Sequence, residues 1–266
     1  MTNYQKVLDF NTKFGATIHS TPVPDIFDSN PFLVKLKMDL IREEFGELKV
    51  AVSNKDYIET IDALADLLYV IYGMATGIGF DMDITFGTIY LSNLSKVSLV
   101  KNTSQFTNFQ KVVYFNNKIG TTVNTTPVVD IFDKDPYCVS SKMYDIQKNM
   151  LELEDNVSDK NYIGTIYSLT NLLHSIYSMG AYIGTDMDKA FDLVHESNMS
   201  KLCSSESEAI DTVNWYYDEF RQNKLPYDSP NFRKSNDGKY WIVYNESSGK
   251  ILKSINYNVV DLSKLL

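Results

Sequence analysis

Six carboxylate side chains recur at helical spacing within a short stretch near the start of the chain. They are Glu43, Glu44 and Glu47, followed by Glu59, Asp62 and Asp66. Residues three, four or seven positions apart lie on the same side of an α-helix, so each group of three forms one acidic stripe. Carboxylate oxygens are ligands that Mg²⁺ prefers, and bound Mg²⁺ can neutralise a polyphosphate and orient a water molecule for attack.

Two predicted helices must carry these stripes and bring them face to face. Residues 34–52 form the first, and residues 56–78 form the second, which is apolar nearly all round and therefore largely buried. Asp62 and Asp66 are then expected to point inward, where a cluster of carboxylates is costly unless a cation neutralises it. Arg42 is the only arginine nearby in the sequence, which leaves a metal ion as the better candidate.

The chain contains two copies of one module. QKVLDFNTKFG (5–15) returns as QKVVYFNNKIG (110–120), and TPVPDIFD (21–28) returns as TPVVDIFD (126–133). The offset is 105 residues in each pair, without insertion or deletion over roughly the first hundred residues. A short chance similarity would not keep this register, so the chain is predicted to be a tandem repeat.

Each copy has four predicted helices with short connections, which favours an antiparallel bundle. We predict a mainly α protein in which two tandem four-helix modules form a pseudo-dimer, with a small C-terminal helix and β-hairpin. The modules span residues 1–100 and 101–203, and the polar stretch 101–108 joins them. The extension spans residues 204–266, and alternation around a Ser-Ser-Gly turn places its hairpin at residues 239–255.

The second copy serves as an internal control for the acidic stripes. Its residues at the positions of Glu43, Glu44, Glu59, Asp62 and Asp66 are Lys148, Asn149, Gly164, Tyr167 and Asn171. Only Glu152, which matches Glu47, remains acidic, whereas the apolar positions of the helix at residues 56–78 persist in the second copy. A single acid such as Glu59 is equally well explained as a solvated surface charge. The joint loss of five acids is instead typical of a metal site that became dispensable in one copy.

Ser-Asn-x-Ser-Lys ends both modules and was kept in the copy that lost its acids. It places Asn93 with Lys96 in the first copy and Asn198 with Lys201 in the second. An asparagine and a lysine one helical turn apart suit a phosphate or a base edge. The alternative is a C-terminal lysine that complements the helix dipole. Asn11 is a further candidate for contact with a nucleobase.

These segments resemble the MazG-like, phosphoribosyl-ATP pyrophosphohydrolase-like group of all-α nucleoside triphosphate pyrophosphatases. The resemblance covers both copies and is carried by IREEFGEL (41–48), DALADLLYVIYG (62–73) and the repeated Ser-Asn-x-Ser-Lys. The tail at 247–262 is similar to that of some phage and bacterial members. The resemblance implies hydrolysis of a (deoxy)nucleoside triphosphate to the monophosphate and pyrophosphate, with Mg²⁺ and with Mn²⁺ as a substitute.

The family pattern assigns roles to individual acids. Members carry an ExxE on one helix, matched by Glu44 and Glu47, and an acid pair on the next helix that ends in aspartate, matched by Asp66. Where members usually have the glutamate of that pair, this chain has Ala63, and Asp62 or Glu59 is expected to substitute.

The resemblance therefore implies metal ligands Glu44, Glu47, Asp62 and Asp66. Glu43 or Glu47 would accept the proton of the attacking water, and Lys96 or Lys201 would pair with phosphate oxygens. Members build their sites between paired subunits, so the two copies would supply that pair within one chain, with further self-association left open. The rival interpretations are a pseudoenzyme that binds nucleotides without turnover, and a partner-binding protein that acts through its C-terminal hairpin.

Composition excludes several other classes. A net charge of −9 and a pI near 4.9 argue against a protein that grips a nucleic-acid backbone. Two cysteines suit a reducing compartment. The most apolar stretch contains Asp66, which argues against a membrane span, and the first residues lack a signal-peptide pattern. We therefore expect a cytoplasmic protein. The richness in Asn, Tyr, Ile and Lys is typical of an AT-rich genome such as that of a virus. A viral protein of this kind would be found in the host cytoplasm or in the virion.

Overall fold

The computed structural model describes residues 1–96 and 103–266. These residues form two compact units. The first comprises Met1–Val7, Ile18–Asp192 and Leu262–Leu266, and the second comprises Leu8–Thr17 and Leu193–Asp261. The predicted boundary between the copies, at residues 100 and 101, lies outside the described residues, so the predicted domain limits stay predictions.

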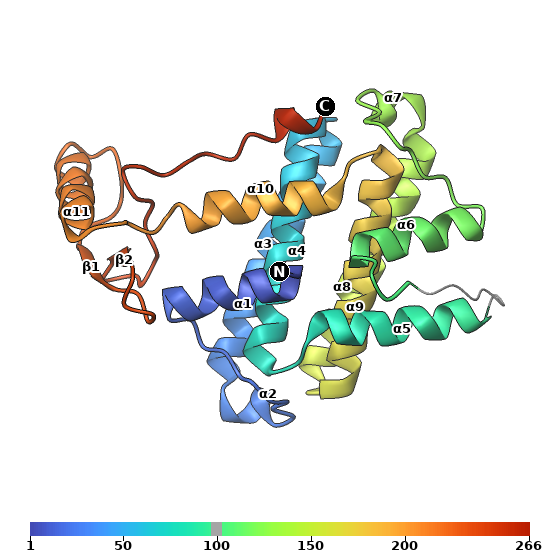
Figure 1. Ribbon diagram of the computed structural model, residues 1–266, viewed down its shortest axis with the longest axis horizontal. Coiled ribbons are helices and arrows are strands. Elements are labelled where there is room, and N and C mark those ends of the chain that lie inside the picture. Colours follow the sequence, from blue (N-terminus) through green and yellow to red (C-terminus); the bar gives the residue numbers. More distant parts are fainter. Residues whose placement is uncertain (97–102) are drawn as a thin grey trace. The chain divides into compact units, whose positions relative to one another are not determined.

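The tandem repeat is visible in the order of the helices (Figure 1). The first copy forms α1 (Asn3–Phe14), α2 (Ile26–Ser29), α3 (Pro31–Ser53), α4 (Tyr57–Ile78) and α5 (Met82–Lys96). The second copy forms α6 (Asn108–Lys118), α7 (Ile131–Lys134), α8 (Pro136–Ser158), α9 (Tyr162–Ile183) and α10 (Met187–Met199). Each helix of the second copy begins 105 residues after its counterpart. The mainly α fold and its duplication are thus confirmed.

The prediction was wrong about how the long second helix of each module begins. The helix predicted at residues 34–52 begins earlier, because α3 starts at Pro31 and its counterpart α8 at Pro136. Proline suits the first helical position because its missing N–H needs no partner there. The side chains of Asn30 and Asp135 accept hydrogen bonds from the free backbone N–H groups that follow. The one-turn helices α2 and α7 were not predicted.

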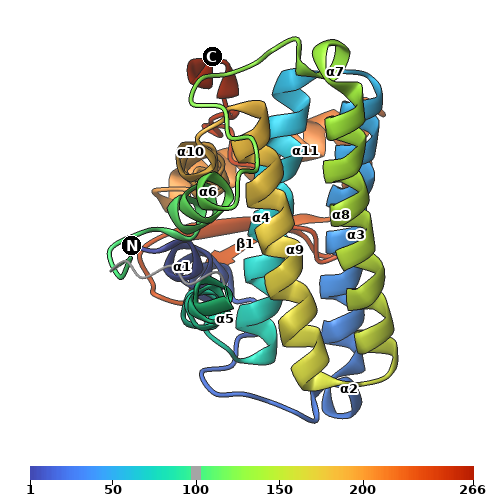
Figure 2. The same cartoon turned by 90° about the vertical axis from the view of Figure 1, so that its right-hand side faces the viewer.

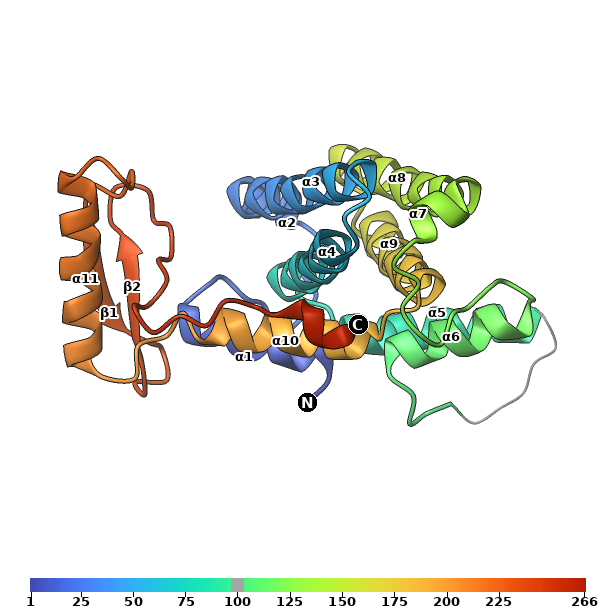
Figure 3. The ribbon, with the colours of Figure 1, turned by 90° about the horizontal axis from the view of Figure 1, so that it is seen from above.

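Four long helices form the centre of the first unit. Figures 2 and 3 show α3 beside α4 and α8 beside α9, with α4 and α9 adjacent. All residues from Ile71 to Ile78 of α4 are buried. By length and composition α4 could cross a membrane, with mean hydropathy 1.4, but 83% of that window is buried inside the structure. Its apolar surface is therefore the surface of a core helix.

Glycine ends both core helices for a steric reason. Gly79 and Gly184 close α4 and α9 in the left-handed conformation, with φ of 88° and 86°. A Cβ atom at either position would lie 2.0 Å from a backbone oxygen, that of Thr21 or Thr126. Only glycine permits this approach, which fixes the loop before α2 or α7 against the end of the core helix.

The two copies are related by a pseudo-twofold axis within the first unit. Tyr57 Oη donates to the backbone oxygen of Ile183 at 2.8 Å, and its counterpart Tyr162 Oη donates to that of Ile78 at 2.8 Å. Exposed ion pairs repeat the symmetry, namely Lys55 with Asp133 and Lys160 with Asp28. Tyr72 and Tyr177, also counterparts, meet hydroxyl to hydroxyl at 3.3 Å. The predicted pseudo-dimer is confirmed by these reciprocal contacts.

We expect the buried tyrosine bonds to matter more for stability than the exposed ion pairs, which are individually worth little. Tyr57→Phe should lower the free energy of unfolding by about 0.5–1.5 kcal/mol, because the carbonyl of Ile183 keeps its bond from the backbone N–H of Val128 but loses the bond from the tyrosine hydroxyl. Tyr162→Phe, the matched change in the other copy, should cost a similar amount. Urea unfolding with an unchanged m-value measures both, and two variants as stable as the parent would show that these bonds do not hold the copies together.

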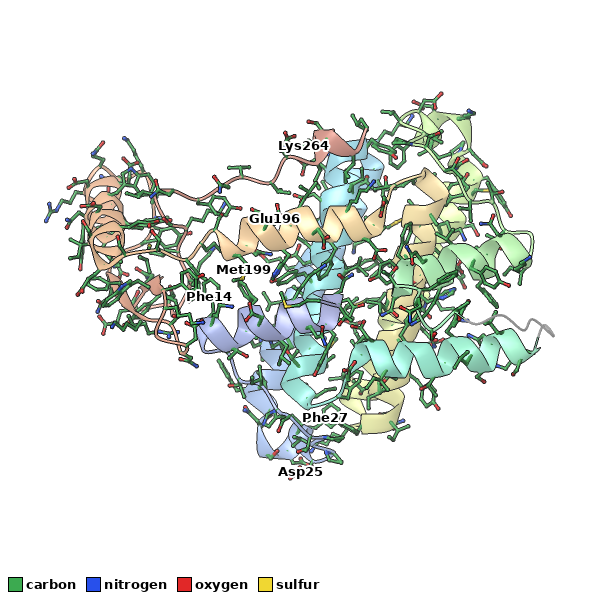
Figure 4. All side chains as sticks on the ribbon, viewed as in Figure 1. Phe14, Asp25, Phe27, Glu196, Met199 and Lys264 are labelled. Atoms are coloured by element: carbon green, nitrogen blue, oxygen red, sulfur yellow. The ribbon has the colours of Figure 1, made fainter. Side chains whose placement is uncertain are left out.

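The second unit contains α11 (Glu206–Arg221), β1 (Pro230–Lys234) and β2 (Trp241–Asn245). The strands pair antiparallel, with Phe232 opposite Val243. Within this unit Phe14 and Ile242 share a buried cluster against which Met199 packs, and Phe14 and Met199 are labelled in Figure 4.

The predicted C-terminal helix and hairpin are confirmed, but one arm of the hairpin was wrong. The first arm became β2, whose main partner is the upstream segment β1 rather than the downstream residues 250–255. An Asn-Asp-Gly turn allows this pairing, because Gly238 adopts a φ of 71° and Asp237 bonds to Ser235. The downstream segment retains a single bridge between Tyr244 and Ile251.

Candidate metal centre

The acidic stripes lie on two adjacent helices, as predicted. On α3, Glu44 is half-buried while Glu43 and Glu47 are exposed. On α4, Asp62 and Asp66 are half-buried. The Asp56 side chain caps α4 by accepting a hydrogen bond from the backbone N–H of Glu59 at 3.1 Å, which fixes where the second stripe begins. The third acid of this helix, Glu59, is exposed.

The electrostatics of Glu44 show that the acids converge. Burial raises the pKa of its carboxyl group to about 8, and the negative charges of Asp66, Glu47, Glu43 and Asp62 add to the rise, in that order. Burial alone raises the pKa of a carboxyl group, and the additional contributions from neighbouring acids arise only where those charges lie close by. The four neighbours come from both stripes, so α3 and α4 do bring their acids together.

Asp62 carries the clearest sign of an unmet interaction. Its Oδ1 atom is buried and has no hydrogen-bond partner among the described residues. Burial raises the pKa of this carboxyl group, followed by the charges of Glu59 and Glu47. Native proteins rarely leave a buried oxygen unpaired unless an ion, water or ligand completes the site.

A cavity of about 460 Å³ opens between the acidic stripes. Five acids line it, together with small residues such as Ala51 and Ala63; the acids are Glu43, Glu47, Asp56, Glu59 and Asp62. Neither lysine nor arginine is among its described lining residues. The cavity is thus strongly negative and would favour a cation.

The donor set fits Mg²⁺ in chemistry, but its side chains do not form a closed cage. Across residues 1–96 and 103–266, no three His, Cys, Asp or Glu side chains stand in position to hold a metal ion. Mg²⁺ characteristically takes one or two carboxylates, waters and substrate phosphates rather than a full protein cage. One or two of the carboxylates that converge on Glu44 would meet this requirement without a closed cage.

The corresponding place in the second copy has lost its negative character. Lys148 forms an ion pair with Glu152 at 3.8 Å, which neutralises the single acid that remains. Asn149 Nδ2 donates to the backbone oxygen of Asn171 at 3.2 Å, so two former acid positions now bond to each other. Among the described residues, the positions that match the two acidic stripes therefore offer no carboxylate pair to a cation.

Comparison with known proteins agrees with this geometry. The sequence model of the phosphoribosyl-ATP pyrophosphohydrolase family matches residues 7–93, which is the copy that carries the acids. An uncharacterised protein of Acanthamoeba polyphaga mimivirus is 37% identical over 268 residues, covering 100% of this chain and 96% of that protein. The chain belongs to the phosphoribosyl-ATP pyrophosphohydrolase-like family. No solved structure matches it.

In this pyrophosphohydrolase-like protein the Ser-Asn-x-Ser-Lys residues are paired internally. Lys96 Nζ donates to Asn93 Oδ1 at 3.3 Å, and Lys201 Nζ donates to Asn198 Oδ1 at 2.6 Å. Asn198, Lys201 and Asn11 belong to the second unit, whereas the acids belong to the first. Contact of these three residues with the substrate therefore stays a prediction. Asn93 instead lines a cavity in the second copy.

Sequence reasoning missed a buried cation on α3. Lys37 is only 7% exposed, and burial lowers the pKa of its ammonium group to about 8. A Cβ atom on Gly73 of α4 would lie 3.6 Å from its Nζ, so the glycine leaves room for the ammonium. Lys37 stands seven residues before Glu44 and shares its face of the helix. The signal was available, because Lys142 occupies the same position in the repeat.

Proposed function

We propose that this protein is a Mg²⁺-dependent nucleoside triphosphate pyrophosphohydrolase with one working site, in the first copy. The reaction would be (d)NTP + H₂O to (d)NMP + pyrophosphate. The family match supports a pyrophosphohydrolase-type activity in general. The observations that carry the finer proposal are the convergence of Asp66, Glu47, Glu43 and Asp62 on Glu44 and the buried, unpaired Oδ1 atom of Asp62.

The residues of the site have separable roles in this proposal. Glu44, Glu47, Asp62 and Asp66 would hold the metal. Mg²⁺ bound there would neutralise the triphosphate and polarise the attacking water. Glu43 and Glu47 are exposed to the cavity, where either could accept the proton of that water. The assay described below determines which base and sugar the enzyme prefers. We propose that its role is house-cleaning, the removal of dUTP or of a modified nucleotide.

The direct test is pyrophosphate release from a panel of canonical and deoxynucleoside triphosphates, with Mg²⁺ or with EDTA. The Glu44→Gln/Glu47→Gln double variant is the control. We expect Mg²⁺-dependent release from at least one nucleotide, which the double variant abolishes. Binding of nucleotide without release by the parent protein would instead favour the pseudoenzyme. That second candidate is favoured by one observation, namely that buried Ala63 stands where relatives usually have a glutamate.

Lys37 is expected to affect substrate binding and folding in opposite directions. Lys37→Met should raise the KM for the nucleotide about ten-fold or more, because a buried ammonium makes strong hydrogen bonds to phosphate. The free energy of unfolding should not fall, since the lowered pKa of Lys37 shows that its charge is costly to bury. Steady-state kinetics and urea unfolding measure the two effects.

The control is Lys142→Met, the same change in the second copy. Lys142 Nζ donates to Ser178 Oγ at 2.9 Å, so this variant tests the loss of a buried lysine away from the acids. Its KM should equal that of the parent protein. Equal kinetic effects in the two variants would contradict a role for Lys37 at the phosphates.

A further inference from the structure

The copy that lost its acids has a cavity of its own. Its volume is about 230 Å³, and its lining comes from α5 of the first copy and from α6, α8 and α9 of the second. All four of these helices belong to the first unit. Asn149 and Asn171, which replace Glu44 and Asp66, lie in its wall. The cavity therefore includes the positions that correspond to two of the proposed metal ligands of the first copy.

Flat aromatic rings form the apolar part of this cavity. Phe86 and His174 stack with ring centroids 6.2 Å apart and an interplanar angle of 23°. Phe115 meets His174 edge to face, at 6.1 Å and 77°. Burial lowers the pKa of His174 to about 4, so its ring is uncharged at neutral pH. The wall is aromatic and carries no charge, which suits a planar, uncharged partner.

Amide side chains form the polar part. Asn93, Asn149 and Asn171 come from three different helices, and Asn149 is half-buried whereas Asn171 is exposed. An amide offers both donors and an acceptor, which matches the mixed edge of a nucleobase. Asp, Glu, Lys and Arg are absent from the described lining residues, so the cavity has no charged side chain to hold a metal ion or a phosphate.

An unpaired hydroxyl inside the cavity indicates that a ligand is missing. Tyr90 is 4% exposed, and its Oη atom has no hydrogen-bond partner among the described residues. The hydroxyl of Thr103 is near enough to oppose the rise that burial causes in the pKa of Tyr90, but it forms no bond of normal geometry. Tyr90 lines the cavity beside Phe86 and Asn93. A buried hydroxyl of this kind is costly unless a ligand completes it.

We propose that this cavity binds an uncharged nucleoside, base first, without a metal ion. Aromatic walls would enclose the planar ring, the amides would read its edge, and Tyr90 would bond to a polar atom at its inner end. The volume lies below the roughly 300–1,000 Å³ of pockets for drug-sized ligands, as expected for a single base with part of its sugar. The proposal does not depend on hydrolysis in the first copy, so the two can fail separately.

The test is calorimetric titration of the full-length protein with adenosine, guanosine, cytidine, uridine and thymidine in EDTA. We expect at least one nucleoside to bind, and Asn171→Leu to abolish that binding. Asn171 is exposed, so this variant should fold, which circular dichroism checks. Tyr90→Phe keeps the ring and should weaken binding about five-fold through the lost hydrogen bond. Glu44→Gln, at the matching position of the first copy, should leave the affinity unchanged.

Two results would overturn the proposal. One is an absence of binding by all five nucleosides at millimolar concentration. The other is binding that Glu44→Gln abolishes and Asn171→Leu leaves intact, which would place the nucleoside in the first copy. Pyrophosphate release is measured separately, so neither result bears on the hydrolase proposal.

Discussion

Asp66→Asn is expected to lower Mg²⁺-dependent pyrophosphate release by at least about 100-fold, since loss of a group that only orients metal ligands already costs 10–100-fold. The change removes one negative charge from the acidic cluster while keeping the shape of the side chain. Asparagine is known to fit this place in the fold, because Asn171 occupies it in the second copy between the same buried leucines, Leu169 and Leu172. Loss of activity would therefore reflect chemistry rather than misfolding.

The matched control is Glu152→Gln, which removes one charge from the acid that the second copy retains. Glu152 pairs with Lys148 at 3.8 Å in an exposed ion pair, so its removal should change neither rate nor stability measurably. Initial rates at saturating Mg²⁺ compare the variants. If Asp66→Asn keeps the parental rate, Asp66 does not hold the metal and the assignment of ligands is wrong.

The affinity for Mg²⁺ should rise about ten-fold for each pH unit between about pH 6 and 8, and then level off. Glu44 has its pKa raised to about 8 by burial and by its acidic neighbours, so below that pH it holds a proton that Mg²⁺ must displace. Titration calorimetry in two buffers of different ionisation enthalpy should count close to one proton released at pH 7. Glu44→Gln should abolish this proton release and flatten the profile.

The same raised pKa has a consequence for the metal-free protein. A carboxyl group that is easier to protonate in the folded state stabilises it fully below the ordinary pKa of 4.5. That contribution is lost as the pH rises through about 8. In EDTA the free energy of unfolding should therefore fall across this interval, and Mg²⁺ should reverse the fall. A metal-free protein whose stability is flat over the interval would show that Glu44 ionises normally.

The helices could be predicted because their signals are local. The apolar residues of α4 recur at helical spacing and Gly79 ends the helix, so both its position and its burial follow from the sequence. The start of α3 was predicted at residue 34 rather than at Pro31, because Pro31 was not recognised as a first helical residue. The second arm of the hairpin was misplaced because β2 lies between two turn sequences, Asn-Asp-Gly at 236–238 and Ser-Ser-Gly at 247–249. Packing, which the sequence does not show, decides on which side β2 finds its partner.

The acidic stripes could be predicted, but the buried lysine of α3 could not. Glu44, Asp62 and Asp66 were recognisable through their spacing and through their loss in the second copy. Lys37 was overlooked because lysine is usually a surface residue, and its burial depends on the glycines of a neighbouring helix. The cavity of the second copy was likewise invisible, because α5 reaches it from the other module.

The reciprocal tyrosine bonds between the copies also bear on how such a site can change over generations. In an assembly of two identical chains, every substitution appears on both sides of the axis at once. Here the halves are encoded separately, so Tyr57 and Tyr162 can each preserve the shared interface while the residues between them drift apart. One half is free to keep its acids, and the other can exchange them for amides without any loss to its neighbour.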